Sequence, residues 1–241
     1  MNIFTNLVPL WVSIFFLICI PIPILMIANL VKQALSNSNI EPKKINRIFI
    51  SILLFYFFYL TYASILSWNG VFSENVLPPR VILFTTLPLV LFFILVVSRL
   101  EIYKIFLQNV KLESLVSVHV FRVIGVFFLI LYFYEAIPQK FAFIAGFGDI
   151  TTAILSIFVA KMIIQKNTYA KKITIIWNLF GILDIVSVLT TAIITTKLSI
   201  ETGTQSVIAI TYFPFCLIPA FAAATIIFLH VSIFRKIFSA K

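Results

Sequence analysis

The residues of this sequence that could do chemistry are ionisable side chains within long apolar segments. Asp149 lies in the run FAFIAGFGDITTAI, in which no other side chain is charged. His119, Arg122, Asp184 and His230 lie in three further apolar segments. Because an ionisable group is expensive in a membrane-like environment, each of these residues indicates a functional site.

Arg122, Asp149 and Asp184 are predicted to meet at one level. A helical rise of about 1.5 Å per residue places each of them roughly 13–17 Å from an end of its segment, close to the midplane of a bilayer. An isolated charge at that depth costs on the order of 3 kcal/mol, so one arginine and two aspartates are expected to pair. We therefore predict a buried polar site in which Arg122 is the electrostatic anchor and both aspartates respond to protons or a ligand. Asn178 is predicted as an orienting hydrogen-bond partner.

The two histidines lie nearer the ends of their segments. We predict that His119 and His230 line an approach to the site from the cytoplasmic side. An alternative is that they are axial ligands of a b-type haem between two helices. Otherwise no cofactor and no metal is predicted.

Small residues and prolines are expected to shape the helices around this site. Small side chains let neighbouring membrane helices approach closely. Prolines interrupt a helix and could make the seventh segment a moving element. The predicted packing residues are Gly125, Gly146, Gly148, Gly181, Pro214 and Pro219.

The segments themselves have the composition of a membrane protein. The 241 residues are 62% hydrophobic and only 11% charged, far less charge than the surface of a soluble domain needs. Runs of about 20 apolar residues recur, and each is long enough to cross a bilayer as a helix. The prediction is an all-α polytopic bundle forming a single transmembrane domain, residues 1–241. Its seven spans are about 7–32, 47–68, 80–99, 112–137, 140–164, 173–196 and 207–234.

The first run resembles a signal peptide only in its position. It lacks a basic segment before the apolar run and a small-residue cleavage site. Pro21 and Pro23 lie within it, so we expect a retained, kinked helix.

The basic residues behind the net charge of +10 are distributed unevenly between the connections of the predicted spans. Of the eighteen basic residues, fourteen follow odd-numbered spans and would lie on one side of the membrane. By the positive-inside rule, the N-terminus is outside and the C-terminus is in the cytoplasm. We expect the lipid bilayer of a bacterial inner membrane as the partner of these residues, and no nucleic acid.

Four functions are compatible with a buried polar site of this kind. We favour a small-molecule or proton-coupled transporter, or a ligand-binding membrane protein, because acidic and histidine side chains inside membranes recur in proton relays. The alternatives are a structural polar network, a b-type haem protein and an enzyme, the enzyme being less favoured. Residues 207–234 contain no lysine, which excludes a retinal Schiff base there.

The enzyme alternative depends on a short resemblance. The stretch GFGD, residues 146–149, resembles the GxGD motif of intramembrane aspartyl proteases, and PAF, residues 219–221, resembles their PAL motif. Those enzymes use two aspartates that share protons and activate water. In them the second aspartate precedes GxGD, whereas Asp184 follows it here.

A longer stretch, from Arg122 to Asp184, resembles an uncharacterised family of bacterial multi-spanning proteins. The resemblance implies that its residues act together and implies no activity. The matching residues are Arg122, Gly125, Pro138, Phe141, Ala142, Ala145, Gly146, Gly148, Asp149, Asn178, Gly181 and Asp184, with Pro219 and His230 extending the match.

Overall fold

The computed structural model describes residues 6–239, which form helices joined by short turns and loops. Within this range, seven helical segments are long and apolar enough to cross a membrane, in agreement with the predicted all-α, multi-pass class. They are Leu10–Ser36, Pro42–Trp68, Ile82–Arg99, Leu112–Phe133, Gln139–Ile164, Ala170–Thr202 and Leu217–Ser239.

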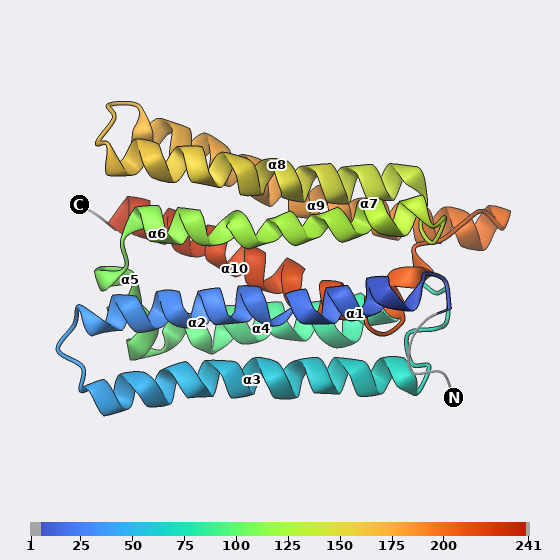
Figure 1. The fold of residues 1–241 in the computed structure, drawn as a ribbon, viewed down its shortest axis with the longest axis horizontal. Helices are drawn as coiled ribbons and strands as arrows, with labels where there is room; N and C mark the ends of the chain where they lie inside the picture. The colour runs from blue at the N-terminus through green and yellow to red at the C-terminus, as the bar shows by residue number, and fades with distance from the viewer. Residues whose placement is uncertain (1–5, 240–241) are drawn as a thin grey trace.

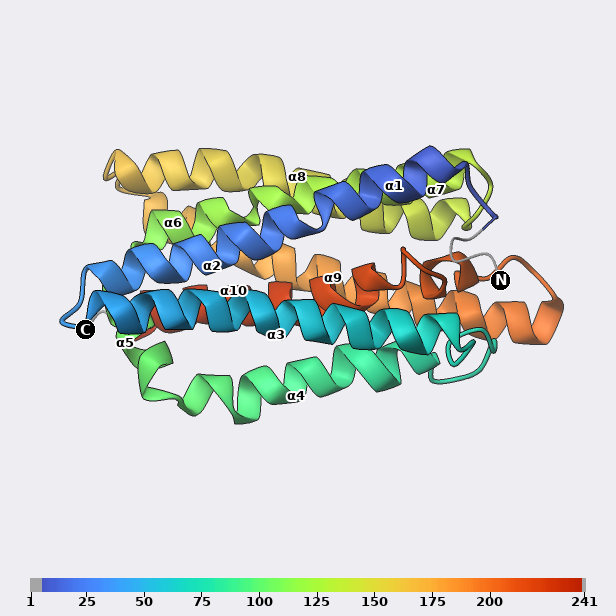
Figure 2. The ribbon, with the colours of Figure 1, turned by 60° about the horizontal axis from the view of Figure 1, so that its bottom comes forward.

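The helices lie side by side along the long axis, and successive spans run in opposite directions (Figures 1 and 2). In chain order the helices are α1 (Leu10–Cys19), α2 (Pro21–Ser36), α3 (Pro42–Trp68), α4 (Leu87–Leu95), α5 (Glu101–Asn109), α6 (Leu112–Ser117), α7 (Val126–Phe133), α8 (Gln139–Ile164), α9 (Ala170–Thr202) and α10 (Leu217–Ser239). Short helical segments of other types are η1 (Ile82–Thr86), η2 (Val97–Arg99), η3 (Val118–Gly125) and η4 (Ile208–Thr211).

The first span is interrupted where the prolines predict. Helix α1 ends at Cys19, and α2 begins at Pro21. Proline has no backbone N–H and is tolerated at the first position of a helix, where that donor has no intrahelical partner. The prediction of a kinked first helix is therefore consistent with the structure.

The seventh span differs from the prediction. It was expected at about 207–234, but α10 begins at Leu217, after the single turn η4 and Pro214. Proline disfavours a helical conformation in the residue before it, which accounts for the break at Pro214 between η4 and α10. Pro219 is the third residue of α10, where a missing N–H costs nothing. Pro219 therefore lies in the first turn of α10 and is not a break within a longer helix.

The fourth span is not a regular α-helix. Between α6 and α7 the chain forms the 3₁₀ segment η3, which has three residues per turn. His119, Arg122 and Gly125 are three residues apart, so in this geometry they lie in one row along the segment. All three are buried. The 3₁₀ segment thus turns a histidine, an arginine and a glycine to the same face.

The fourth and seventh spans form the centre of the bundle. In each of them 56% of the most apolar stretch is buried, compared with 22% in the second and third spans. The 3₁₀ segment η3 packs against α8, and α8 packs against α9. Large apolar side chains such as Phe57, Phe58 and Leu183 are more than 60% exposed, as expected for surfaces that face lipid.

Candidate functional site

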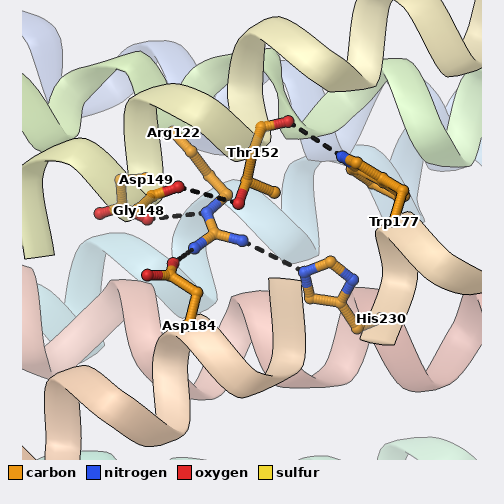
Figure 3. A network of polar contacts seen from close by, with 7 residues as sticks. All are labelled: Arg122, Gly148, Asp149, Thr152, Trp177, Asp184 and His230. Carbon is orange, nitrogen blue, oxygen red and sulfur yellow. Dashed lines mark hydrogen bonds and ion pairs between the residues drawn. The ribbon is translucent and has the colours of Figure 1, made fainter. Parts of the chain in front are cut away.

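The side chain of Arg122 is the centre of a buried polar network (Figure 3). Its Nε donates a hydrogen bond to Asp149 Oδ1 at 2.7 Å, and its Nη2 donates to Asp184 Oδ2. Its third nitrogen, Nη1, lies 3.2 Å from His230 Nε2. The three partners come from α8, α9 and α10, so one guanidinium joins four spans. The predicted contact among Arg122, Asp149 and Asp184 is thus present.

Two carboxylates share one edge of this guanidinium. Nε and Nη2 form the edge that ordinarily binds both oxygens of a single carboxylate. Here that edge binds one oxygen of Asp149 and one of Asp184. The second oxygen of each carboxylate has no hydrogen-bond partner among residues 6–239, and in Figure 3 it points away from Arg122, opposite His230. The network therefore holds one cation beside two like-charged groups.

Asn178 determines how His230 takes part. The Asn178 Nδ2 donates to the backbone carbonyl of His230 at 3.0 Å, which turns the Asn178 Oδ1 toward His230 Nδ1 at 2.7 Å. A carboxamide oxygen can only accept, so His230 Nδ1 donates. His230 Nε2 then carries the lone pair and accepts from Arg122. This pattern fixes a neutral imidazole of one tautomer. Asn178 contacts the site through His230, as an orienting partner would.

Hydrogen bonds of Trp177 and Thr152 also connect α9 to α8 beside the network. The indole N–H of Trp177 donates to the backbone carbonyl of Thr152 at 3.1 Å, and the Thr152 hydroxyl donates to the carbonyl of Gly148 at 2.9 Å (Figure 3). Sequence reasoning did not include Thr152 among the site residues. The sequence gives only a weak sign of this role, because threonine hydroxyls within helices commonly bond to the carbonyl four residues earlier. The role of the Thr152 carbonyl becomes visible only from the buried Trp177 indole that donates to it.

Glycines permit the close approach of the polar side chains. A Cβ atom added at Gly148 would overlap Asp184 Oδ1, and one added at Gly181 would overlap the imidazole of His230. Neither neighbour is free to withdraw, because each is bonded within the network. Both positions therefore require a residue without a side chain.

Two more glycines lie where the fourth span contacts α8. A Cβ atom at Gly125 would overlap the side chain of Asp149, and one at Gly146 would lie 2.7 Å from Leu129 Cδ2. Three of the six glycines in the sequence, Gly125, Gly148 and Gly181, therefore border the network, and Gly146 packs against Leu129. Each of them was predicted as a packing residue.

His119 packs against the network without bonding to it. Its ring is fully buried, with its centroid 4.2 Å from that of His230 and 5.2 Å from that of Trp177. Neither ring nitrogen has a hydrogen-bond partner among residues 6–239. An unsatisfied buried polar group costs about 1–3 kcal/mol, so His119 is not explained by stability.

The packing of His119 and His230 also bears on the haem alternative. Two axial ligands must lie on opposite faces of a haem, and rings in mutual contact leave no space for the macrocycle between them. In this structure the two rings are therefore not placed as a pair of haem ligands. Within residues 6–239, no group of three or more His, Cys, Asp or Glu side chains is arranged to hold a metal ion.

Asp149 lines two adjoining cavities. The large cavity, of about 70 Å³, lies among α9, α10, η1 and the loop before η1, with mainly apolar walls. The ion pair of Glu74 and Arg80 lies in that loop, with 2.5 Å between Glu74 Oε2 and Arg80 Nη2. The small cavity, of about 40 Å³, is lined by residues of the first span, η3 and α10, and it includes Arg122. The large cavity has room for roughly five water-sized molecules.

A comparison with known proteins places the chain in a family. A family model described as "Domain of unknown function (DUF8737)" matches residues 78–238, about two thirds of the chain. The match includes every residue of the network. No curated protein and no solved structure matches the chain.

Replacing Gly181 by alanine tests the close approach of α9 to His230. Gly181→Ala is expected to destabilise the protein by about 2 kcal/mol, within the range for overpacking a buried contact. The measurement is thermal unfolding of purified protein in detergent. Ser187→Thr, which adds a methyl group at an exposed position of the same helix, is the control and should unfold like the wild type. Equal stability of Gly181→Ala and the control would contradict the contact.

Removing Arg122 alone, or all three charges together, tests whether the fold needs the network. Arg122→Met leaves two buried carboxylates without their partner and is expected to destabilise the protein by about 3–5 kcal/mol. The triple variant Arg122→Met, Asp149→Val, Asp184→Val removes all the charges and should regain most of this stability. Size-exclusion chromatography and thermal unfolding give the comparison. A triple variant as unstable as Arg122→Met would show that the fold needs the network.

Proposed function

The chain belongs to the family described as Domain of unknown function (DUF8737), and we propose that it binds a small molecule at Asp149 with exchange of a proton. The site would make it a proton-coupled transporter or ligand-binding protein of a bacterial inner membrane. One observation carries the proposal: a buried network with one more acid than base adjoins a cavity.

The charge imbalance requires a positive partner. Arg122 compensates one of the two carboxylates when both are ionised, and His230 is held neutral by Asn178. An uncompensated charge at the midplane of a bilayer costs on the order of 3 kcal/mol. A proton or a cationic group at the free carboxylate oxygens removes that cost. Binding of a cationic group then releases the proton, and binding of a proton releases the cationic group, so that ligand binding and proton exchange are coupled.

The cavities indicate the kind of molecule. Asp149 is the polar group shared by the large and small cavities, and its neighbours there include Phe128, Ile218 and Ile226. Glu74, the other acidic residue of the large cavity, is paired with Arg80, which leaves Asp149 as the acidic group there without a full share of positive charge. Such a site with mainly apolar walls suits a small molecule with an apolar body and a single hydrogen-bond donor or positive charge. An ammonium ion with a short hydrocarbon body has this chemistry.

The alternatives fit the geometry less well. A purely structural network would satisfy its members, yet His119 is buried without a partner and two carboxylate oxygens remain unbonded within residues 6–239. An aspartyl protease needs its two carboxylates to hold a water molecule between them. In this protein one oxygen of Asp149 and one of Asp184 are both bonded to Arg122 instead. Both observations favour ligand binding.

Asp149→Asn tests proton coupling. We expect proteoliposomes of the wild type on a solid-supported membrane to give a charge displacement after a pH step. The displacement of the variant should be at least tenfold smaller, because an amide does not take up or release a proton near neutral pH. The control is Glu201→Gln, an exposed carboxylate at the end of α9. Short alkylammonium ions, tested by thermal shift, should stabilise the wild type and not Asp149→Asn. Identical responses of the two proteins in both assays would contradict the proposal.

We also propose that the bundle is oriented with its N-terminus outside. Most basic side chains lie at the end of the bundle where α2 ends and α10 ends, and such residues are retained in the cytoplasm. Asn39→Cys, between α2 and α3, should react with a membrane-impermeant maleimide only after cell lysis. Thr204→Cys, after α9, should react in intact cells. The wild type, with Cys19 half-buried and Cys216 buried, is the background control. The reverse pattern would invert the topology.

A further inference from the structure

A second pocket lies far from the network, at the end of the bundle that holds most basic residues. It opens between the end of α2 and the junction of α5 and α6, which lie close together in Figures 1 and 2. Its volume is about 570 Å³, much larger than that of either cavity at Asp149. The residues of this lysine pocket are Asn29, Leu30, Lys32, Gln33, Ala34, Ser36, Asn37, Asn109, Val110, Lys111 and Ser114.

The lysine pocket has the chemistry of an anion site. Lys32 and Lys111 contribute two positive charges, and within residues 6–239 its lining includes no carboxylate. Lys32 is half-buried, and its Nζ lies 5.1 Å from the centre of the Phe49 ring of α3. Carboxamides and hydroxyls supply further hydrogen bonds, while buried Leu30 and Val110 form an apolar floor. Such a lining suits an anion with several oxygens, such as a phosphate.

The depth of the pocket is that of lipid headgroups. Lys32 precedes the last residue of its span, Ser36, by one helical turn, or about 6 Å. A lysine so near the end of a membrane helix reaches the headgroup region, where anionic lipids attract basic side chains. A phosphate bound in this pocket would therefore lie level with the phosphates of the surrounding leaflet.

The exposed face of α2 leads from the pocket toward the membrane interior. Ile22, Leu25, Asn29 and Gln33 are all exposed and follow one another at three- and four-residue steps, which places them on one stripe of the helix. The stripe is apolar at Ile22 and Leu25 and polar where it enters the pocket. A molecule with a polar head and a hydrocarbon tail matches this order, whereas a soluble phosphate matches only the pocket.

We propose that the lysine pocket binds the phosphate-bearing headgroup of an anionic membrane lipid, with one acyl chain along the exposed stripe of α2. The site is separate from Asp149 and does not depend on the function proposed there. It would anchor α2, which packs against α3 and α5, to the membrane surface.

Native mass spectrometry of the purified protein tests this proposal with phosphatidylglycerol as the probe. Lys32→Gln with Lys111→Gln should weaken its binding roughly 30-fold, and the exposed Lys111→Gln alone roughly fivefold. The control replaces Lys171 and Lys172, two exposed lysines at the same end of the bundle, by glutamine and should bind like the wild type. Glycerol 1-phosphate, which has the headgroup chemistry without a tail, should not compete at the same concentration.

The other outcomes overturn the proposal. Unchanged phosphatidylglycerol binding in both Lys111 variants removes the pocket as the site. Equal weakening in the Lys171 and Lys172 variant shows a general effect of charge. Competition by glycerol 1-phosphate at equal concentration shows that the pocket selects a soluble phosphate and not a lipid.

Discussion

The bonds from Arg122 to Asp149 and Asp184 are the interaction on which the second half of the bundle depends. Charges in a hydrocarbon interior must be paired, so the positions of η3, α8, α9 and α10 are constrained by one guanidinium. Because apolar contacts alone do not drive helices together within lipid, such directional bonds also specify which faces meet. The first three spans carry no comparable constraint, and the second and third of them are the most exposed of the seven.

The local irregularities of the chain serve this centre. A 3₁₀ segment replaces α-helix at residues 118–125 and turns His119, Arg122 and Gly125 to one side. Glycines stand where the carboxylates and His230 approach a neighbouring helix. A 3₁₀ turn has poorer hydrogen-bond geometry than an α-turn, and a glycine weakens helix formation. These features favour the arrangement of the site over the regularity of its helices.

The two proposed sites lie at different depths along the bundle. The acidic network lies where water is scarce, so uncompensated charge there has a large energetic effect and can be coupled to a proton or a ligand. The lysine pocket lies near a bundle end, where two positive charges are less costly and where we propose that a lipid phosphate binds. Charged side chains thus have different energetic consequences at the midplane and at the interface.

The sequence alone determined the helical class and the seven apolar segments within residues 6–239, apart from the start of the seventh, because hydrophobic runs near 20 residues have one solution in lipid. It also identified the glycines that border the network. Only the tertiary structure decided that both carboxylates share one edge of Arg122, that His119 has no partner among residues 6–239, and that α10 begins at Leu217. These depend on helix rotation, on the 3₁₀ turn and on proline geometry, since side-chain contacts between distant segments are set by packing and not by local pattern.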